Sequence, residues 1–268
     1  MNETSLDPGT PPKPTRRGIY LLPNLFTTAA LFAGFYAIVA AIGGRYEAAA
    51  VAVFVAMVLD GVDGRVARMT NTQSAFGAEY DSLCDMVSFG VAPALVAFEW
   101  SLHSLGKLGW LAAFVYTAAA ALRLARFNTQ IAVADKRYFQ GLPSPSAAAL
   151  VAGMVWAGYE QEIAGESVRY FAFAVTLVAG LLMVSNFRYH SFKALDLQGK
   201  VRFVTVLAVV LVFVLVSVHP PHILFLGFFL YAASGPAVTV VQLRRRRAGR
   251  RTPNVTRGPE GGAPRGPS

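Results

Sequence analysis

The sequence predicts an all-α fold: a polytopic membrane helix bundle of about eight transmembrane helices, with both termini on the cytoplasmic side. The 268-residue chain is 54% hydrophobic and only 15% charged, and its mean hydropathy is +0.46. Several apolar runs approach the roughly 20 residues that a helix needs to cross a bilayer. The helices of a soluble domain would instead break such runs with polar faces. The basic residues are also distributed very unevenly among the predicted loops, which is typical of membrane proteins.

Eight apolar segments account for the predicted spans. In chain order they are centred on Leu25–Ile42, Ala48–Leu59, Met86–Ser101, Gly109–Leu124, Ala147–Tyr159, Phe171–Ser185, Phe203–Val218 and Ile223–Val241. Pro143 and Pro145 favour a turn that leads into the fifth helix and starts it. Pro220 and Pro221 favour a short loop before the eighth helix.

The segments at the two ends are predicted to be tails. Residues 1–16 are polar and rich in proline, lack the pattern of a signal peptide, and are expected to form a disordered cytoplasmic tail. Residues 17–243 would form one transmembrane domain. Residues 244–268 would form a tail that is first basic and then rich in glycine and proline, and disordered.

Charge predicts the orientation of the bundle. With eight spans, only Arg45, Lys107 and Arg169 of the 24 basic residues fall on the side opposite the termini. The positive-inside rule therefore assigns both termini to the cytoplasm, and an odd number of spans would place one arginine-rich terminus outside. The run Arg244–Arg247 directly follows a span and has no interleaved aromatic residues. We interpret this run as topological and expect no nucleic-acid partner.

Four carboxylates, those of Asp60, Asp63, Asp81 and Asp85, stand inside or against strongly apolar sequence, where they are costly unless they have partners. The first two are three residues apart and the last two are four apart, so each pair shares one face of its helix. The second span has only a short apolar core, so its helix must continue through the first pair, which places the acids at a membrane edge. Two acidic faces lined with small residues can hold hard divalent cations and leave room for a phosphate ligand. The spacing therefore predicts a site for metal-dependent phosphoryl transfer.

The acids and their neighbours also resemble a family signature. The pattern Asp60-x-x-Asp63-Gly64-x-x-Ala67-Arg68, followed after eight residues by Gly77-x-x-x-Asp81-x-x-x-Asp85, is similar to the motif of the CDP-alcohol phosphatidyltransferases. Eight specified positions in a fixed register are far more specific than a lone glycine-rich loop.

The resemblance implies a role for each of these residues. The metal ligands would be Asp60, Asp63, Asp81 and Asp85, holding two divalent cations, Mg²⁺ or Mn²⁺, which prefer oxygen ligands. The nucleotide and its diphosphate would contact Gly64, Ala67, Arg68 and Gly77. Asp85 would also act as the general base that takes the proton of the acceptor hydroxyl while CMP leaves. The family also implies a homodimer.

Four further stretches resemble the phosphatidylserine synthase branch of that family: Pro23–Thr27, Arg123–Asn128, Gly141–Pro145 and Arg188–Lys193. This resemblance implies CDP-diacylglycerol and L-serine as substrates and phosphatidylserine and CMP as products. Serine carries a carboxylate and an ammonium group, so its site needs donors as well as acceptors. The candidates for contacts with the acceptor or the lipid headgroup are Asn24, Arg123, Arg126, Asn128, Ser144, Arg188 and Lys193. The basic residues among them equally fit contacts with lipid phosphate or a purely topological role.

Three alternatives remain open. The same chemistry could use another alcohol, such as glycerol 3-phosphate, inositol phosphate or choline. A divalent-cation or organic-ion transporter would also carry acids in the membrane, but here the acids cluster at one edge and the other spans lack a continuous polar path. A non-catalytic lipid-binding scaffold would not need the complete acidic set together with Arg68.

We predict a multi-pass integral membrane enzyme, in contact with membrane lipids, whose site faces the cytoplasm of a bacterial-type inner membrane.

Overall fold

The computed structural model of the chain describes residues 21–70, 74–130, 138–190 and 216–249, together with positions 207, 210, 211 and 214. Its elements in chain order are α1 (Leu21–Ile42), α2 (Tyr46–Met69), α3 (Ala75–Asp85), a π-helix η2 (Met86–Val91), α4 (Ala92–Trp100), a 3₁₀ helix η3 (Leu102–Leu105), α5 (Lys107–Gln130), β1 (Tyr138–Gln140), α6 (Ser144–Glu160), a 3₁₀ helix η4 (Gly165–Val168), α7 (Arg169–Val184), β2 (Arg188–His190) and α9 (Pro220–Gly249).

Five of the predicted spans are confirmed as helices long and apolar enough to cross a membrane. They cover Pro23–Ile42, Ala75–Trp100, Lys107–Thr129, Gly165–Val184 and Pro220–Thr239. The helix over Ala75–Trp100 begins eleven residues before the predicted start at Met86, because α3, η2 and α4 form one continuous helical stretch that includes Asp81 and Asp85.

Of the other three predicted spans, two are helices and the third lies mostly outside the described residues. Ala48–Leu59 and Ala147–Tyr159 are helical and lie within α2 and α6, but α2 carries charges along its second half and α6 is only 17 residues long. Most of Phe203–Val218 lies outside the described residues, as do residues 1–16 and 250–268 of the predicted tails. Helix α9 continues through residues 244–249, the beginning of the predicted basic tail.

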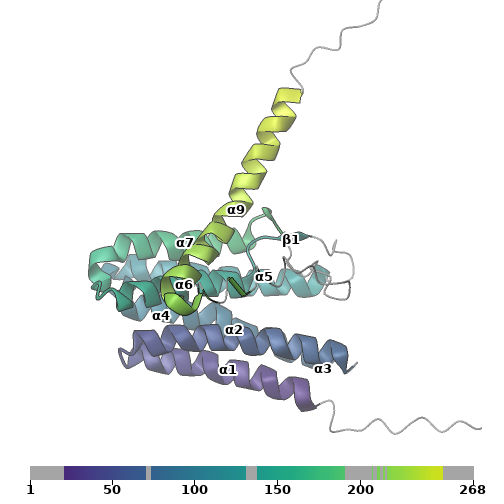
Figure 1. Cartoon of the computed structure of the whole chain (residues 1–268), viewed down its shortest axis with the longest axis horizontal. Coiled ribbons are helices and arrows are strands. Elements are labelled where there is room, and N and C mark those ends of the chain that lie inside the picture. Colours follow the sequence, from purple (N-terminus) through teal and green to yellow (C-terminus); the bar gives the residue numbers. More distant parts are fainter. Residues whose placement is uncertain are drawn as a thin grey trace, which may run out of the picture.

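Small residues hold the bundle together. Helices α1 and α2 form an antiparallel hairpin (Figure 1) around a turn in which Gly44 adopts a φ of +71°. Their contact face is made of alanines with at most 1% exposure, such as Ala37, Ala40, Ala49 and Ala56. Small side chains let helix backbones approach closely, which supplies the van der Waals contact on which helix association in membranes depends.

The structure is nearly all helical, as predicted, and two short strands that were not predicted form an antiparallel ribbon. Tyr138, Phe139 and Gln140 pair with His190, Tyr189 and Arg188, in that order. The strands follow α5 and α7 and lie at the end of the bundle where these helices finish (Figure 1). Pairing satisfies the backbone groups of these residues, which lie outside the helices, and three residues are too few to show a strand pattern in the sequence.

The ribbon is fastened to α9 through one aromatic side chain. Tyr189 is buried, and its hydroxyl donates a hydrogen bond of 2.9 Å to the carbonyl oxygen of Ala232. Gly235 lies so close that a Cβ there would be 2.3 Å from the ring carbon Cζ of Tyr189. The middle of the C-terminal helix is therefore packed against the ribbon.

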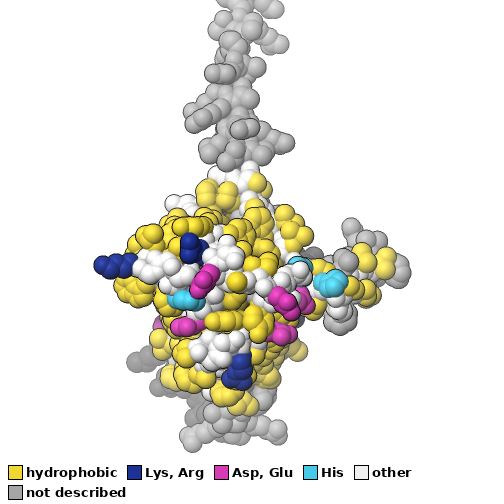
Figure 2. Space-filling model, turned by 90° about the vertical axis from the view of Figure 1, so that its left-hand side faces the viewer, with side chains coloured by type: hydrophobic (Ala, Val, Ile, Leu, Met, Phe, Trp, Pro, Cys, Tyr) yellow, Lys and Arg dark blue, Asp and Glu magenta, His cyan; other side chains and the backbone are white. Residues whose placement is uncertain are grey.

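The opposite end of the bundle is formed by the turn between α1 and α2, by η3 and by η4. Figure 2 shows this end, where acidic and histidine side chains gather among hydrophobic ones. His222 Nδ1 lies 3.3 Å from an oxygen of Glu160, which joins the start of α9 to the end of α6.

Two glycines of α9 give a matched test of how this helix packs. Gly235→Ala should lower the melting temperature of the purified protein, because overpacking against Tyr189 costs about 1–3 kcal/mol. Gly227→Ala has open space around the added methyl group and should be neutral or stabilising, because alanine favours helix. Thermal unfolding followed by fluorescence compares the two; equal melting temperatures would contradict the close packing of Tyr189 on α9.

Candidate active site

Three carboxylates from two helices meet at the end of the bundle that carries the ribbon. Asp60 and Asp63 belong to the second half of α2, and Asp81 belongs to α3. One oxygen atom from each of them lies within 4.8 Å of the others, and Asp63 is buried while the other two are half-buried. The structure therefore brings together the two acidic pairs that lie some twenty residues apart in the sequence.

The cluster fits a divalent cation. Oδ1 of Asp81 is buried and has no hydrogen-bond partner among the residues that the structure describes. Several carboxylates at this separation repel one another, and a cation removes that cost. The donors are carboxylate oxygens, which suit hard ions such as Mg²⁺ and Mn²⁺. The geometry thus supports a metal site, without identifying the metal.

Asp85 joins this group from a distinctive position in the backbone. It is the last residue of α3, directly before the π-helix, and its carboxyl group is in hydrogen-bonding contact with that of Asp60. Single π-helical turns within α-helices are frequent at functional sites. The turn here packs tightly against α1, since Ser88 donates a hydrogen bond of 3.1 Å to the carbonyl oxygen of Ala30. A Cβ at Gly34 would lie only 2.6 Å from Oγ of Ser88, so this glycine lets the two segments approach.

The other residues of the motif surround the acids. Gly64 and Arg68 lie one turn apart on α2, and the Arg68 guanidinium interacts electrostatically with Asp63. Ala67 is half-buried on the same helix. Gly77 is in the first turn of α3, where its N–H donates to Oγ of Ser74, the N-cap residue, at 3.0 Å. A Cβ at this glycine would lie 3.1 Å from that oxygen, which leaves little room for a larger residue.

The structure places the predicted acceptor residues in different surroundings. Asn24 and Asn128 touch the acidic helices: Oδ1 of Asn24 lies beside Gly77, and the amide of Asn128 exchanges hydrogen bonds with the Ser82 hydroxyl. Ser144 is buried at the start of α6. Arg188 is placed only through its backbone in β2, and Lys193 lies outside the described residues.

Two arginines at the end of α5 are held in defined positions. Nε of Arg123 donates a hydrogen bond of 2.6 Å to the carbonyl oxygen of Leu142, and the guanidinium interacts electrostatically with Asp85. Nη2 of Arg126 donates to the side-chain oxygens of Gln140 in β1 and Asn186. Both partners of Arg126 are neutral amides, so these contacts orient its charge without neutralising it.

Three contacts at the site were not predicted from the sequence. Thr27 Oγ1 donates a hydrogen bond of 2.7 Å to Oδ2 of Asp63, and both residues are buried. Gln140 and Asn186 orient Arg126. Thr27 belongs to Pro23–Thr27, one of the four stretches with a family resemblance, but nothing in the sequence shows that it faces an acid 36 positions away.

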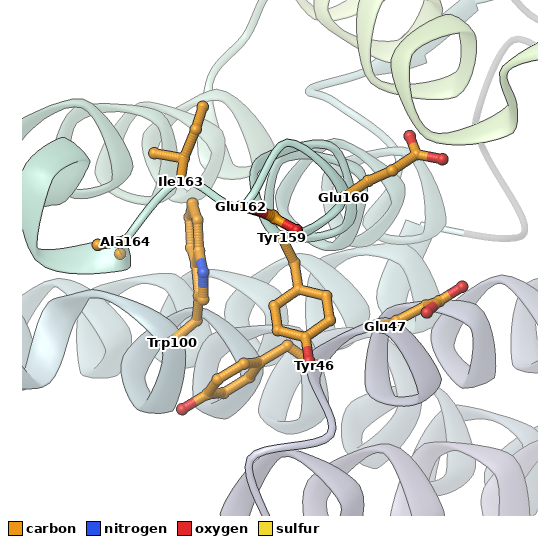
Figure 3. Close-up of a pocket in the computed structure, with 9 residues that line it drawn as sticks. Tyr46, Glu47, Trp100, Tyr159, Glu160, Glu162, Ile163 and Ala164 are labelled. Carbon is orange, nitrogen blue, oxygen red and sulfur yellow. The ribbon is translucent and has the colours of Figure 1, made fainter.

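A hollow of about 710 Å³ lies at the opposite end of the bundle (Figure 3). Trp100, Tyr46 and Tyr159 form its aromatic walls, while the side chains of Glu47 and Glu160 point away from Trp100. Tyr46 begins α2, whereas Asp60 lies roughly 20 Å further along the same helix at 1.5 Å per residue. This hollow is therefore separate from the acidic cluster.

Comparison with known proteins agrees with the geometry. A sequence model described as CDP-alcohol phosphatidyltransferase matches residues 20–185. A protein of Helicobacter pylori strain 26695, named CDP-diacylglycerol–serine O-phosphatidyltransferase, is 39% identical over 197 residues, which cover 73% of this chain and 83% of the relative. Proteins with the same name from Methanocaldococcus jannaschii (33% identical; 68% of this chain and 80% of the relative) and Mycobacterium tuberculosis strain H37Rv (42%; 52% and 51%) are also similar.

The acidic cluster predicts a measurable affinity for metal in the absence of any substrate. Addition of Mn²⁺ should raise the melting temperature of the purified protein, since a ligand at about 100 times its Kd stabilises the folded state by about 2.7 kcal/mol. Asp81→Asn should lose most of this effect because it removes one ligand. Glu79→Gln, an exposed acid on the same helix, removes the same charge and should keep it. A full Mn²⁺ response in Asp81→Asn would contradict the assignment of the site.

Proposed function

Because the chain belongs to the CDP-alcohol phosphatidyltransferase family, we propose that it transfers the phosphatidyl group of CDP-diacylglycerol to the hydroxyl group of L-serine. The products are phosphatidylserine and CMP. The observation that carries the chemistry is the convergence of the motif's carboxylates from α2 and α3 into one cluster. Serine as the acceptor is supported by relatives from bacteria and an archaeon that carry the name of this activity.

The carboxylates are the groups proposed to hold the metal. Asp60, Asp63 and Asp81, with Asp85 beside them, would bind two divalent cations, Mg²⁺ or Mn²⁺. When bound, such ions offset the charge of the diphosphate and stabilise the charge that develops on the transferred phosphoryl group. Arg68 would add a bidentate contact to a phosphate, and the small residues Gly64, Ala67 and Gly77 would leave space for the cytidine nucleotide.

Asp85 is proposed to act as the general base. Its carboxylate would accept the hydroxyl proton of serine as the oxygen attacks the phosphorus that carries the diacylglycerol. A new P–O bond to serine then forms, and the bond between this phosphorus and the oxygen of CMP breaks. The position of Asp85, at the junction of α3 and the π-helix and in contact with Asp60, supports this role. The guanidinium of Arg123 interacts electrostatically with this carboxyl group.

Arg126 is the strongest candidate for the serine carboxylate. Its described hydrogen bonds go to amide oxygens of Gln140 and Asn186, so its charge stays available for an anion, to which arginine can bind with two parallel hydrogen bonds. Five further residues could contact serine or the lipid headgroup: Asn24, Asn128, Ser144, Arg188 and Lys193. Arg123 is held against Leu142 and faces Asp85, so we assign it to the electrostatics of the base.

The topology completes the proposal. Eight transmembrane helices with both termini in the cytoplasm would put the acidic cluster at the cytoplasmic face of a bacterial-type inner membrane. Residues 17–243 would form the transmembrane domain, between the two tails. Two observations support this orientation. The acids, Arg123, Arg126 and the ribbon lie at one end of the bundle. At the other end, helix ends carry Arg45, Lys107 and Arg169. We also propose a homodimer, as an expectation for this family.

A panel of alcohols tests the choice of acceptor. Purified protein with CDP-diacylglycerol and Mn²⁺ or Mg²⁺ should release CMP when L-serine is added, and much less with glycerol 3-phosphate, inositol phosphate or choline. CMP release measured with each alcohol separately gives the answer. Robust release with another alcohol and none with serine would replace serine as the substrate while leaving the chemistry intact.

The proposed base is tested by Asp85→Asn. The variant should fold and insert like the native protein but lose about 10²–10⁴-fold in turnover, the usual contribution of general acid–base catalysis. Single-turnover CMP formation at saturating serine measures it, with Glu79→Gln as the variant that removes a nearby exposed acid. Turnover close to that of the native protein in Asp85→Asn would rule out Asp85 as the base.

A further inference from the structure

We infer that Thr27 is a positioning residue of the metal site, although it lies on α1, outside the acidic motif. Its hydroxyl group holds one oxygen of Asp63 and thereby orients this carboxylate toward the other acids. The inference rests on the metal-dependent chemistry proposed above, and it adds a residue that the acidic motif does not contain.

The contact is short, buried and charge-assisted. Oγ1 of Thr27 lies 2.7 Å from Oδ2 of Asp63, and both residues are 5% exposed. A second acceptor, the carbonyl oxygen of Pro23, lies at 3.2 Å. The hydroxyl has one proton, and hydrogen bonds to ionised acceptors are shorter and about twice as strong as those between neutral groups. The proton therefore goes to Asp63.

Burial makes a hydrogen-bond donor important for the Asp63 carboxylate. It is buried, whereas Asp60 and Asp81 are half-buried. A carboxylate can rotate about its terminal bond, and the hydrogen bond from Thr27 to Oδ2 restricts this rotation in a residue that belongs to the cluster. Groups that orient metal ligands in this way typically change metal affinity or activity 10–100-fold when they are removed.

The neighbouring residue offers a matched control. Thr28 is also β-branched and lies on the same helix, and its hydroxyl group likewise lies beside the carbonyl oxygen of the residue four positions earlier, that of Asn24, at 2.7 Å. Its other hydrogen-bond partner is the hydroxyl of Tyr80, at 2.9 Å, and it is exposed. Thr28 thus shares the local helix chemistry of Thr27 without the contact to an acid.

The experiment measures Mn²⁺ binding to the full-length purified protein without substrate, by electron paramagnetic resonance of free Mn²⁺. Thr27→Val keeps the shape of the side chain but removes the donor, and should raise the apparent Kd for Mn²⁺ about 10–100-fold. Thr27→Ser restores the donor and should bind Mn²⁺ nearly as the native protein does. Thr28→Val should leave the affinity unchanged.

A second readout separates positioning from a general loss of structure. The Mn²⁺ concentration for half-maximal CMP release should rise in Thr27→Val, while saturating Mn²⁺ should recover most of the rate. Should the valine variant not be purified in folded form, Thr27→Cys, of similar volume and only a weak donor, carries the same expectation.

Two outcomes would overturn the inference: native Mn²⁺ affinity in Thr27→Val, or an equal loss of affinity in Thr28→Val. Failure of the proposed function would look different. The native protein would then bind Mn²⁺ and Thr27→Val would bind it more weakly, but neither would release CMP from CDP-diacylglycerol.

Discussion

The mutual repulsion of several carboxylates in an apolar bundle is the constraint on which the rest of the structure depends. Asp60, Asp63 and Asp81 lie within a few ångströms of one another, and Asp85 contacts Asp60. Acids in membrane segments are costly unless they have partners, and they are therefore typical of functional sites. Divalent cations relieve this repulsion when they bind to the carboxylates. Bound divalent cations can also stabilise the charge on a transferring phosphoryl group, so the same arrangement suits phosphoryl transfer. The relief of this repulsion therefore contributes to the free energy of metal binding.

Close helix packing makes the cluster possible. The alanine face between α1 and α2 brings these helices together, and Gly34 admits the π-helical turn that follows Asp85. As a result, α1 supplies Thr27 to the acids, although its own sequence carries no charge. In lipid, where the hydrophobic effect does not drive helices together, such small-residue contacts are what fixes the geometry.

The second half of the site depends on the C-terminal part of the chain. The ribbon of β1 and β2 carries Gln140, which orients Arg126, and Tyr189 fastens the ribbon to α9. The carbonyl oxygen of Leu142, just after β1, holds Arg123 beside Asp85. Helix α9 thus supports the proposed acceptor side, while α1 supports the metal side.

The sequence by itself determined the class of fold and the reaction chemistry. Apolar length and the spacing of acids are local properties, so the five confirmed spans and the pairs on α2 and α3 could be predicted from residues a few positions apart. Only the tertiary structure decided which distant residues meet. The contacts between Thr27 and Asp63, Asn128 and Ser82, and Arg126 and Asn186 join positions 36, 46 and 60 residues apart. Such contacts follow from how whole helices pack, and no short pattern in the sequence records them.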